Sequence, residues 1–466
     1  MRKKIVMFKN LLLLFAIFSF LHPLKADDES SNTETVKSPA QILEEQRRNT
    51  LRFGTETEIA ALIQTLKNEK LSYLDEEIIG IAKGTRNRAI LAGIFGFFGE
   101  MEKSGLEERA VKAVQERDQE ANDTVTAAVD YLGRVKAVQA VDCLEELINT
   151  RESRFLNNAI KALGRAASNS DHADRIASFF LDYYDNRNPS DESKREIIAA
   201  LGETRSRESV SFLSNLAKNS DAKAFLRMVA LEAISKIGDE EGLGAVIEAV
   251  SSNDPNVRST AVAALAPFSG EDVDSAILEA FRDSYYRTRI GAAQAAGKRR
   301  LESAIPYLRY RAENDDVPNV KDEAIRALGI INTPDTMGIL DSLFAERKNS
   351  DRTRIIAAEM LLQNNAETYG RRVLLEMDEA KSKNQTALYN GFVRVMAGAK
   401  AASMADIARR FILGGGVIEK SLALDIIQNN EFTALADEIR SLLDEKVHSA
   451  TIARKAQSTL TKLGLE

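Results

Sequence analysis

A ten-residue phrase of small and apolar residues recurs along this chain and constrains its fold more than any other feature. It is clearest as VRSTAVAALA (Val257–Ala266), TRIGAAQAAG (Thr288–Gly297) and VKDEAIRALG (Val320–Gly329). Eight weaker or equivalent copies end at residues 96, 133, 164, 202, 235, 362, 398 and 428, so neighbouring phrases end 30 to 38 residues apart. A period of that length is typical of stacked supersecondary units and not of one globular domain.

Each phrase predicts one helix, and the sequence between two phrases predicts another. Within a phrase, small residues three apart, such as Ala261 and Ala264, form a helix face that a neighbouring helix can approach closely. Between phrases, residues such as Ile277 and Phe281 have the spacing of an amphipathic helix. No stretch alternates with period two in β-favouring residues. We therefore predict an all-α protein, an α-solenoid of about twelve stacked antiparallel helix pairs over residues 41–466.

The chain around residue 254 resembles a HEAT repeat. Asp254-Pro-Asn-Val-Arg258, followed by Ala261 and the Ala264-Leu265 pair, is similar to short HEAT repeats of the kind also found in phycobilisome-lyase-like arrays. The resemblance covers residues 85–430 well and implies a HEAT/armadillo-like superhelix. It also implies that a turn aspartate and an arginine early in the second helix form a ladder between repeats. The matching residues are Asp254 with Arg258, Asp283 with Arg289, Asp221 with Arg227 and Asp351 with Arg354.

Residues 1–26 have the pattern of a secretory signal peptide. Basic residues near the start precede an apolar stretch from Leu11 to Leu21, and Ala26 is a small residue at the expected cleavage point. The apolar stretch is short for a bilayer span, and an uncleaved anchor is the alternative interpretation. Residues 27–40 are polar and predict a flexible linker. We expect a periplasmic or secreted protein with no transmembrane span after cleavage.

Charge and cysteine content narrow the classes of function. Loss of residues 1–26 removes five basic residues and no acidic ones, which changes the formal charge from −7 to −12. That charge argues against a nucleic-acid or anionic-membrane partner. Cys143 is the only cysteine, so no intramolecular disulfide can form. Its position between Val141 and Leu144 in an apolar pattern predicts a buried thiol.

Motifs for catalysis, metal binding or cofactor binding are not found in the sequence. The three histidines, His22, His172 and His448, lie far apart, and HExxH, paired CxxC and GxSxG patterns are absent. Residues 291–298 (GAAQAAGK) differ from a phosphate-binding loop in glycine spacing, and Arg299 stands where the loop has a hydroxyl residue. We predict no enzyme, no cofactor and no metal site. The phycobilisome-lyase resemblance implies the alternative, a tetrapyrrole-lyase-like enzyme or accessory.

One basic segment departs from the acidic background of the chain. Between Arg282 and Arg311 there are eight basic and two acidic residues, a local charge of +6. Arginine and tyrosine are enriched at the energetic centres of protein interfaces. We predict a partner-binding patch, made of Arg299, Arg300, Arg309, Arg311, Tyr285, Tyr286 and Tyr307. The alternative is that some of these side chains belong to the ladder or to the core.

The predicted solenoid offers one continuous concave surface, because helices of successive repeats line up. We therefore predict a non-enzymatic scaffold or adaptor in an extracytoplasmic complex, which binds an envelope protein through this face. A further hypothesis is an envelope structural protein that binds an anionic glycan through the basic patch.

Overall fold

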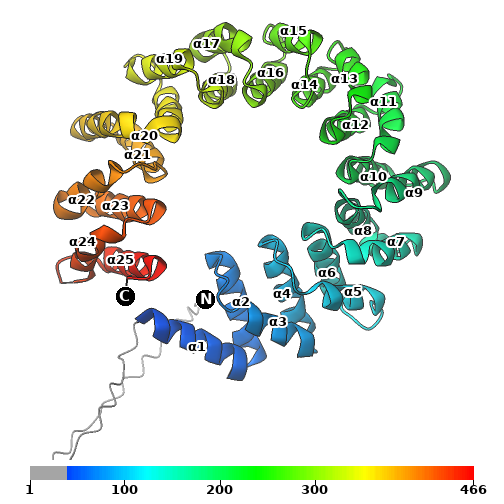
Figure 1. Ribbon diagram of the computed structural model, residues 1–466, viewed down its shortest axis with the longest axis horizontal. Helices are drawn as coiled ribbons and strands as arrows, with labels where there is room; N and C mark the ends of the chain where they lie inside the picture. Colours follow the sequence, from blue (N-terminus) through cyan, green and yellow to red (C-terminus); the bar gives the residue numbers. More distant parts are fainter. Residues whose placement is uncertain (1–38, 445, 466) are drawn as a thin grey trace, which may run out of the picture.

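The computed structural model describes residues 39–444 and 446–465, which form a single curved array of helices (Figure 1). These residues contain 25 α-helices and no β-strand. The helices are arranged in two layers along an arc that nearly closes in the view of Figure 1, with α1 and α25 at its ends. The predicted all-α solenoid is confirmed. The predicted signal peptide and residues 27–38 of the predicted linker lie outside the described residues, and the first helix already begins at Pro39.

The inner layer consists of the helices that carry the recurring phrases, preceded by α2 and followed by α25. Its members are α2 (Glu56–Glu69), α4 (Arg88–Glu100), α6 (Asn122–Arg134), α8 (Ser153–Ala166), α10 (Asp191–Thr204), α12 (Ala224–Ile237), α14 (Pro255–Ala264), α16 (Tyr286–Arg299), α18 (Pro318–Ile331), the first half of α20 (Asp351–Ser382), α21 (Thr386–Ala397), α23 (Val417–Asn430) and α25 (Ala450–Leu463).

The outer layer consists of the helices between the phrases. Its members are α1 (Pro39–Phe53), α3 (Asp75–Gly84), α5 (Glu107–Gln115), α7 (Val141–Asn149), α9 (Ala173–Asn186), α11 (Val210–Lys218), α13 (Leu243–Ala249), α15 (Glu271–Ala280), α17 (Ile305–Asn314), α19 (Pro334–Ala345), the second half of α20, α22 (Met404–Gly414) and α24 (Ala436–Arg440). Short 3-10 helices complete the described chain: η1 (Val138–Ala140), η2 (Arg207–Ser209), η3 (Glu240–Gly242), η4 (Glu302–Ala304), η5 (Thr433–Leu435) and η6 (Ser441–Leu443).

Helix α20 is shared by two neighbouring repeats. It runs for 32 residues, and only Asn365, with φ −155° and ψ 73°, leaves the helical conformation inside it. The Asn365 side chain accepts a hydrogen bond from the Thr368 amide at 3.0 Å, as a helix-capping residue does. The first half therefore ends one repeat in the inner layer, and the second half begins the next repeat in the outer layer. With α20 counted twice, the described residues form thirteen helix pairs, close to the predicted twelve.

The core lies between the two layers and is continuous along the arc. Buried apolar side chains from Leu51 to Leu460 form one cluster. The inner helices contact one another most closely at the glycine that ends several phrases. A Cβ atom added at Gly164 would lie 2.9 Å from the Cα atom of Ala200, and one added at Gly202 would lie 2.8 Å from that of Ala233. The small residues of the phrase are thus required where consecutive inner helices meet.

Some of the expected ladder residues form rungs between repeats, but not in the expected pairs. Arg258 does not pair with Asp254; its guanidinium donates to Asp283 of the next repeat at 2.9 and 3.2 Å, and to the Ser252 carbonyl oxygen at 2.8 Å. Asp254 caps α14 by accepting from two backbone amides at its start. The arginine lies one turn inside its helix and reaches across the repeat boundary, so each rung ties two repeats together.

The next rung repeats this pattern in a buried setting. Arg289 donates to both carboxylate oxygens of Asp315 at 2.8 Å, instead of pairing with the Asp283 side chain. The side chains of Arg289 and Asp315 are only 7% and 0% exposed. Burial alone would raise the pKa of Asp315, but hydrogen bonds from Arg289 and from the Val317 amide lower this pKa below its usual value. The pair therefore remains ionised inside the protein.

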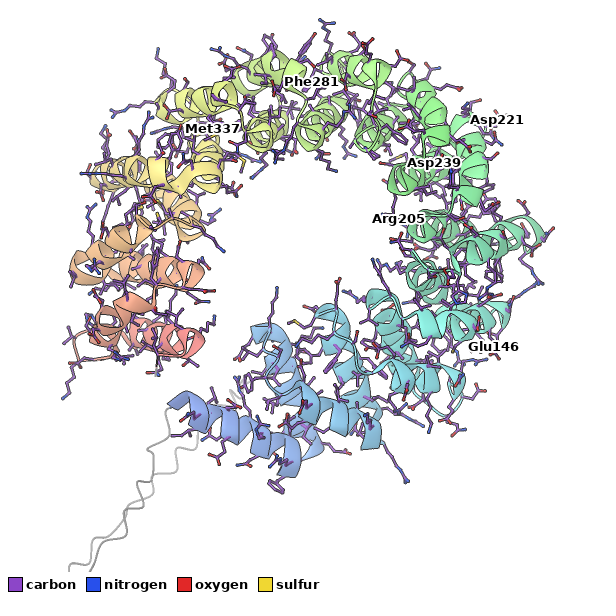
Figure 2. All side chains as sticks on the ribbon, viewed as in Figure 1. Glu146, Arg205, Asp221, Asp239, Phe281 and Met337 are labelled. Atoms are coloured by element: carbon purple, nitrogen blue, oxygen red, sulfur yellow. The ribbon has the colours of Figure 1, made fainter. Side chains whose placement is uncertain are left out.

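The two outermost predicted rungs also differ from expectation. Arg227 donates to the Ala217 carbonyl oxygen at 3.0 Å, and no ion pair links it to Asp221 among the described residues. Asp221 is exposed in the turn after α11, on the outer side of the arc (Figure 2). Arg354 donates to Glu376 at 2.6 Å, whereas Asp351 is exposed in the first turn of α20. In each case the aspartate nearest in sequence is not the partner.

Cys143 is buried in α7, as the sequence predicts, with an exposed fraction of 9%. Burial raises the pKa of its thiol to about 11. We expect an aromatic disulfide reagent to modify Cys143 at least ~10-fold more slowly in the native protein than in the urea-unfolded chain, because the thiolate is the reactive form. Absorbance of the released thiolate measures both rates. Equal rates in the two states would contradict this expectation.

None of the described helices is both long enough and apolar enough to cross a membrane. The most apolar inner helix, α4, packs its large side chains, Ile94, Phe95, Phe97 and Phe98, into the core.

Candidate binding surface on the inner wall

The residues of the predicted basic patch are spread over both ends of α16 and over α17. Tyr285 and Tyr286 lie at the start of α16, and Arg299 and Arg300 lie at its other end. A helix of this length separates them by about 20 Å. Tyr307, Arg309 and Arg311 lie on α17 in the outer layer, whereas α16 belongs to the inner layer.

Two of the four patch arginines are used within the fold. Arg299 donates to Asp274 of α15 at 2.5 Å, and Arg311 donates to the Phe281 carbonyl oxygen at 2.5 Å and to Asp315 at 3.2 Å. Reversing their charges would therefore disturb the fold as well as any surface. Arg300 and Arg309 are exposed, although Arg309 pairs with Glu313 one turn away.

The patch tyrosines are likewise held by neighbouring side chains. Tyr285 donates its hydroxyl to Asn256 at 2.8 Å, and Tyr307 stacks on the buried ring of Phe281 at 5.7 Å. Figure 2 places Phe281 in the upper part of the arc. Two of the predicted tyrosines accept a hydrogen bond from an exposed arginine through their hydroxyls, Tyr286 from Arg287 and Tyr307 from Arg282. These contacts favour a structural role for most of the predicted patch.

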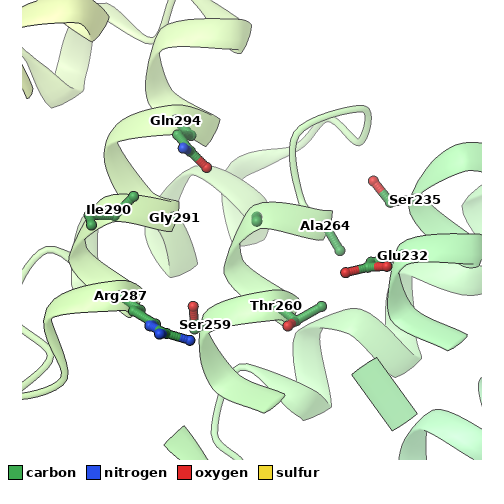
Figure 3. A pocket seen from close by; sticks show the side chains of 10 residues that line it. Glu232, Ser235, Ser259, Thr260, Ala264, Arg287, Ile290, Gly291 and Gln294 are labelled. Carbon is green, nitrogen blue, oxygen red and sulfur yellow. The ribbon is translucent and has the colours of Figure 1, made fainter. Parts of the chain in front are cut away.

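The inner wall, meaning the exposed faces of the inner helices, carries a hollow near the middle of the arc. This hollow, here called the trough, has a volume of about 360 Å³. It is lined by Glu232 and Ser235 of α12, by Ser259, Thr260, Ala263 and Ala264 of α14, and by Arg287, Ile290, Gly291 and Gln294 of α16 (Figure 3).

The trough exists because the side chains of α14 that face the inside of the arc are short. Ser259, Thr260 and Ala263 form its floor, between longer side chains on the two flanking helices. Helices α14 and α16 are close together there, since a Cβ atom added at Gly291 would lie 3.1 Å from the Ser259 carbonyl oxygen. A glycine at this position lets α16 approach the floor of the trough.

Opposite charges stand on the two sides of the trough. Figure 3 shows Glu232 on the α12 side and Arg287 on the α16 side, with Ser259 and Thr260 between them. Glu232 is exposed and makes no hydrogen bond or ion pair with any described residue. The Arg287 Nε atom donates to the Tyr286 hydroxyl at 3.1 Å, and this hydrogen bond raises the pKa of Arg287 above its usual value. Both side chains are charged and accessible to a partner.

The sequence contains a signal for this surface that the patch hypothesis overlooked. The seventh residue of most of the phrases lies on the inner wall and varies in chemistry, whereas the small residues around it are buried. These seventh residues include Asp130, Lys161, Ala199, Glu232, Ala263, Gln294, Arg326, Glu359 and Asp425. Variation at one helical position among constant small residues could have located the inner wall.

The side chains of the trough can form polar contacts with a ligand. Among residues 39–444 and 446–465, no group of three or more His, Cys, Asp and Glu residues is arranged to hold a metal ion. The trough presents a carboxylate, a guanidinium, three hydroxyls and an amide. These groups can form hydrogen bonds and ion pairs with a ligand.

The architecture and its ladder define this chain as a HEAT-repeat solenoid. The family described as "Spirochaete HEAT repeat protein" matches residues 51–459. Because this match covers most of the chain, the protein belongs to that family.

Curated and solved proteins with similarity to the chain are distant. A deoxyhypusine hydroxylase of Debaryomyces hansenii is 25% identical over 161 residues, which are 34% of this chain and 50% of the hydroxylase. The chain thus spans about half the length of the curated relative it matches. The karyopherin Kap121p, solved with the extreme C-terminus of the phosphatase Cdc14p, is 11% identical with a TM-score of 0.41, covering 92% of this chain and 55% of Kap121p. Human deoxyhypusine hydroxylase is 16% identical with a TM-score of 0.26, covering 57% of this chain and 99% of the hydroxylase.

Proposed function

We propose that this protein is a non-enzymatic scaffold that binds a partner protein through its inner wall, with the trough as a principal contact. The observation that carries the proposal is the pair Glu232 and Arg287. Neither charge is neutralised by an ion pair within the described chain, and the two flank a floor of small polar residues. Complementary charges on a partner would set its register and orientation on the wall.

We further propose an extracytoplasmic location, in which the partner belongs to the cell envelope. The support is the signal-peptide pattern of residues 1–26, which lie outside the described residues. Fractionation of cells followed by N-terminal sequencing of the protein tests this location. A new N-terminus near Asp27 in the extracytoplasmic fraction would support the proposal, and an intact Met1 in the cytoplasm would refute it.

Reversal of both trough charges tests the binding site. We expect the double variant Glu232→Lys, Arg287→Glu to lose at least ~10-fold in affinity for a partner that the wild-type protein captures from an envelope fraction, because two complementary contacts become repulsive. Binding is measured by interferometry with the purified partner. The matched control is Glu240→Lys, Arg371→Glu, which reverses two exposed charges outside the trough.

The outcome separates this proposal from its alternatives. Equal loss in the control would show a general charge effect, and unchanged affinity in the double variant would remove the trough as the site. The tetrapyrrole-lyase and hydroxylase alternatives predict turnover of a substrate by the purified protein. The glycan alternative predicts salt-sensitive retention on purified envelope polymer that is lost in Arg300→Glu, Arg309→Glu.

A further inference from the structure

The inner wall has a second hollow, about 590 Å³ in volume, beyond the trough. It lies where α18, the first half of α20, and α21 meet, next to the helix that two repeats share. Its lining residues are Asp322, Arg326, Asp351, Arg352, Ile355, Ile356, Glu359, Leu362, Gln363, Ala387, Arg394, Val395, Gly398 and Ala399. Three acidic and three basic residues are included, so the distribution of the charges decides what the hollow can bind.

Two ion pairs occupy the side of the hollow between α18 and α20. Arg352 donates its Nε atom to Asp322 at 2.6 Å, and Arg326 donates to Glu359 at 3.0 Å. Each pair joins two neighbouring inner helices, so these four charges neutralise one another locally. Asp351 lies in the first turn of α20, where a carboxylate is stabilised by the helix amides.

Arg394 on α21 is the remaining basic residue of the hollow. Its side chain is exposed, and it forms no hydrogen bond, ion pair or ring contact with any described residue. The surface beside it is apolar, with Val395 on the same helix and Ile355 on α20. Helices α20 and α21 are in close contact there, because a Cβ atom added at Gly391 would overlap the Ile355 side chain. The site thus combines one unpaired guanidinium with an adjoining apolar surface.

We propose that this second hollow binds an acidic segment of the partner protein, in which a carboxylate pairs with Arg394 and an adjacent apolar side chain covers Ile355 and Val395. This inference rests on the proposed scaffold function and adds a second anchor point on the same wall. A guanidinium forms two parallel hydrogen bonds with a carboxylate, which gives geometric specificity as well as affinity. A basic or neutral segment lacks this interaction.

Three labelled peptides that differ only in one residue type test the proposal. Each peptide has twelve residues in the same repeated pattern, in which leucine alternates with glutamate in the first, glutamine in the second and lysine in the third. Binding of each peptide to the full chain is measured by fluorescence anisotropy. We expect the glutamate peptide to bind at least ~10-fold more tightly than the other two, and Arg394→Gln to remove this preference. Arg371→Gln is the matched control, since Arg371 is exposed on the second half of α20 and outside the hollow.

A charge-reversed variant distinguishes the loss of this ion pair from a general loss of binding affinity. Arg394→Glu should bind the glutamate peptide more weakly and the lysine peptide more tightly than the wild-type protein does. Its helical content, measured by circular dichroism, should be unchanged. Equal affinities of the three peptides for the wild-type protein, or a preference that survives Arg394→Gln, would overturn the proposal. These outcomes leave the trough experiment untouched, because Glu232 and Arg287 lie on other helices and are tested with the captured partner.

Discussion

Replacement of Arg289 by alanine is expected to lower the free energy of unfolding by ~3–5 kcal/mol, the usual cost of breaking a buried ion pair by removal of one partner. The change leaves the Asp315 carboxylate, which is 0% exposed, without the guanidinium that donates to both of its oxygens. Arg311 retains one hydrogen bond to Asp315 at 3.2 Å, so we expect the lower part of that range. The loss also removes the bonds from Arg289 to the carbonyl oxygens of Asp283 and Ser284 in the preceding turn.

Urea titration followed by circular dichroism measures this effect, with Arg309→Ala as the control. Arg309 is 60% exposed and pairs with Glu313 only across one helical turn, an arrangement worth less than ~1 kcal/mol. The two variants lose the same charge from neighbouring repeats. If they were equally stable, Arg289 would not contribute as a rung between repeats.

Gly202→Ala is expected to destabilise the protein by ~1–3 kcal/mol, although alanine is the better helix former. The new methyl group would lie 2.8 Å from the Cα atom and 2.9 Å from the Cβ atom of Ala233 on α12. Backbone atoms cannot move aside as a flexible side chain can, so the two inner helices would have to separate. Such a separation weakens the packing of the next repeat as well.

Gly338→Ala in α19 is the matched control for this variant. It makes the same change inside a helix, but no atom lies within 4 Å of the added Cβ position. We expect the free energy of unfolding of this control to rise by up to ~1 kcal/mol, because alanine has a higher helix propensity than glycine. Thermal unfolding of both variants measures the difference, and a stabilised Gly202→Ala protein would show that α10 and α12 are not in close contact at this point.

The architecture could be predicted from sequence because the repeated small residues have one physical cause. Gly164 and Gly202 end their phrases where one inner helix meets the next, so close packing favours a glycine at this position in several repeats. The spacing of the phrases along the sequence therefore predicts both the helix pairs and their stacking. The break at Asn365 was not predicted, because α20 joins two repeats without the glycine or proline that usually marks a turn.

The contacts between repeats were harder to predict than the repeats. Arg258 and its partner Asp283 are 25 residues apart, and local sequence favours the nearer Asp254, whose carboxylate is engaged in capping α14. The orientation of the arginines in the basic patch was hard to predict for a related reason. A run of arginines gives the local charge, but whether Arg299 or Arg300 turns toward the fold depends on the helix phase and on the acceptors of the neighbouring helix.

The shared helix α20 sets where this protein can be divided. Elsewhere a turn separates each inner helix from the following outer helix, so the chain can be shortened there by whole repeats. Within α20 the boundary between the two repeats lies at Asn365, so a cut elsewhere between Asp351 and Ser382 opens a helix and leaves a flanking repeat incomplete. Fragments that end before Pro334 or begin after Ala397 retain only whole repeats, because both repeats that contain a part of α20 are then removed together.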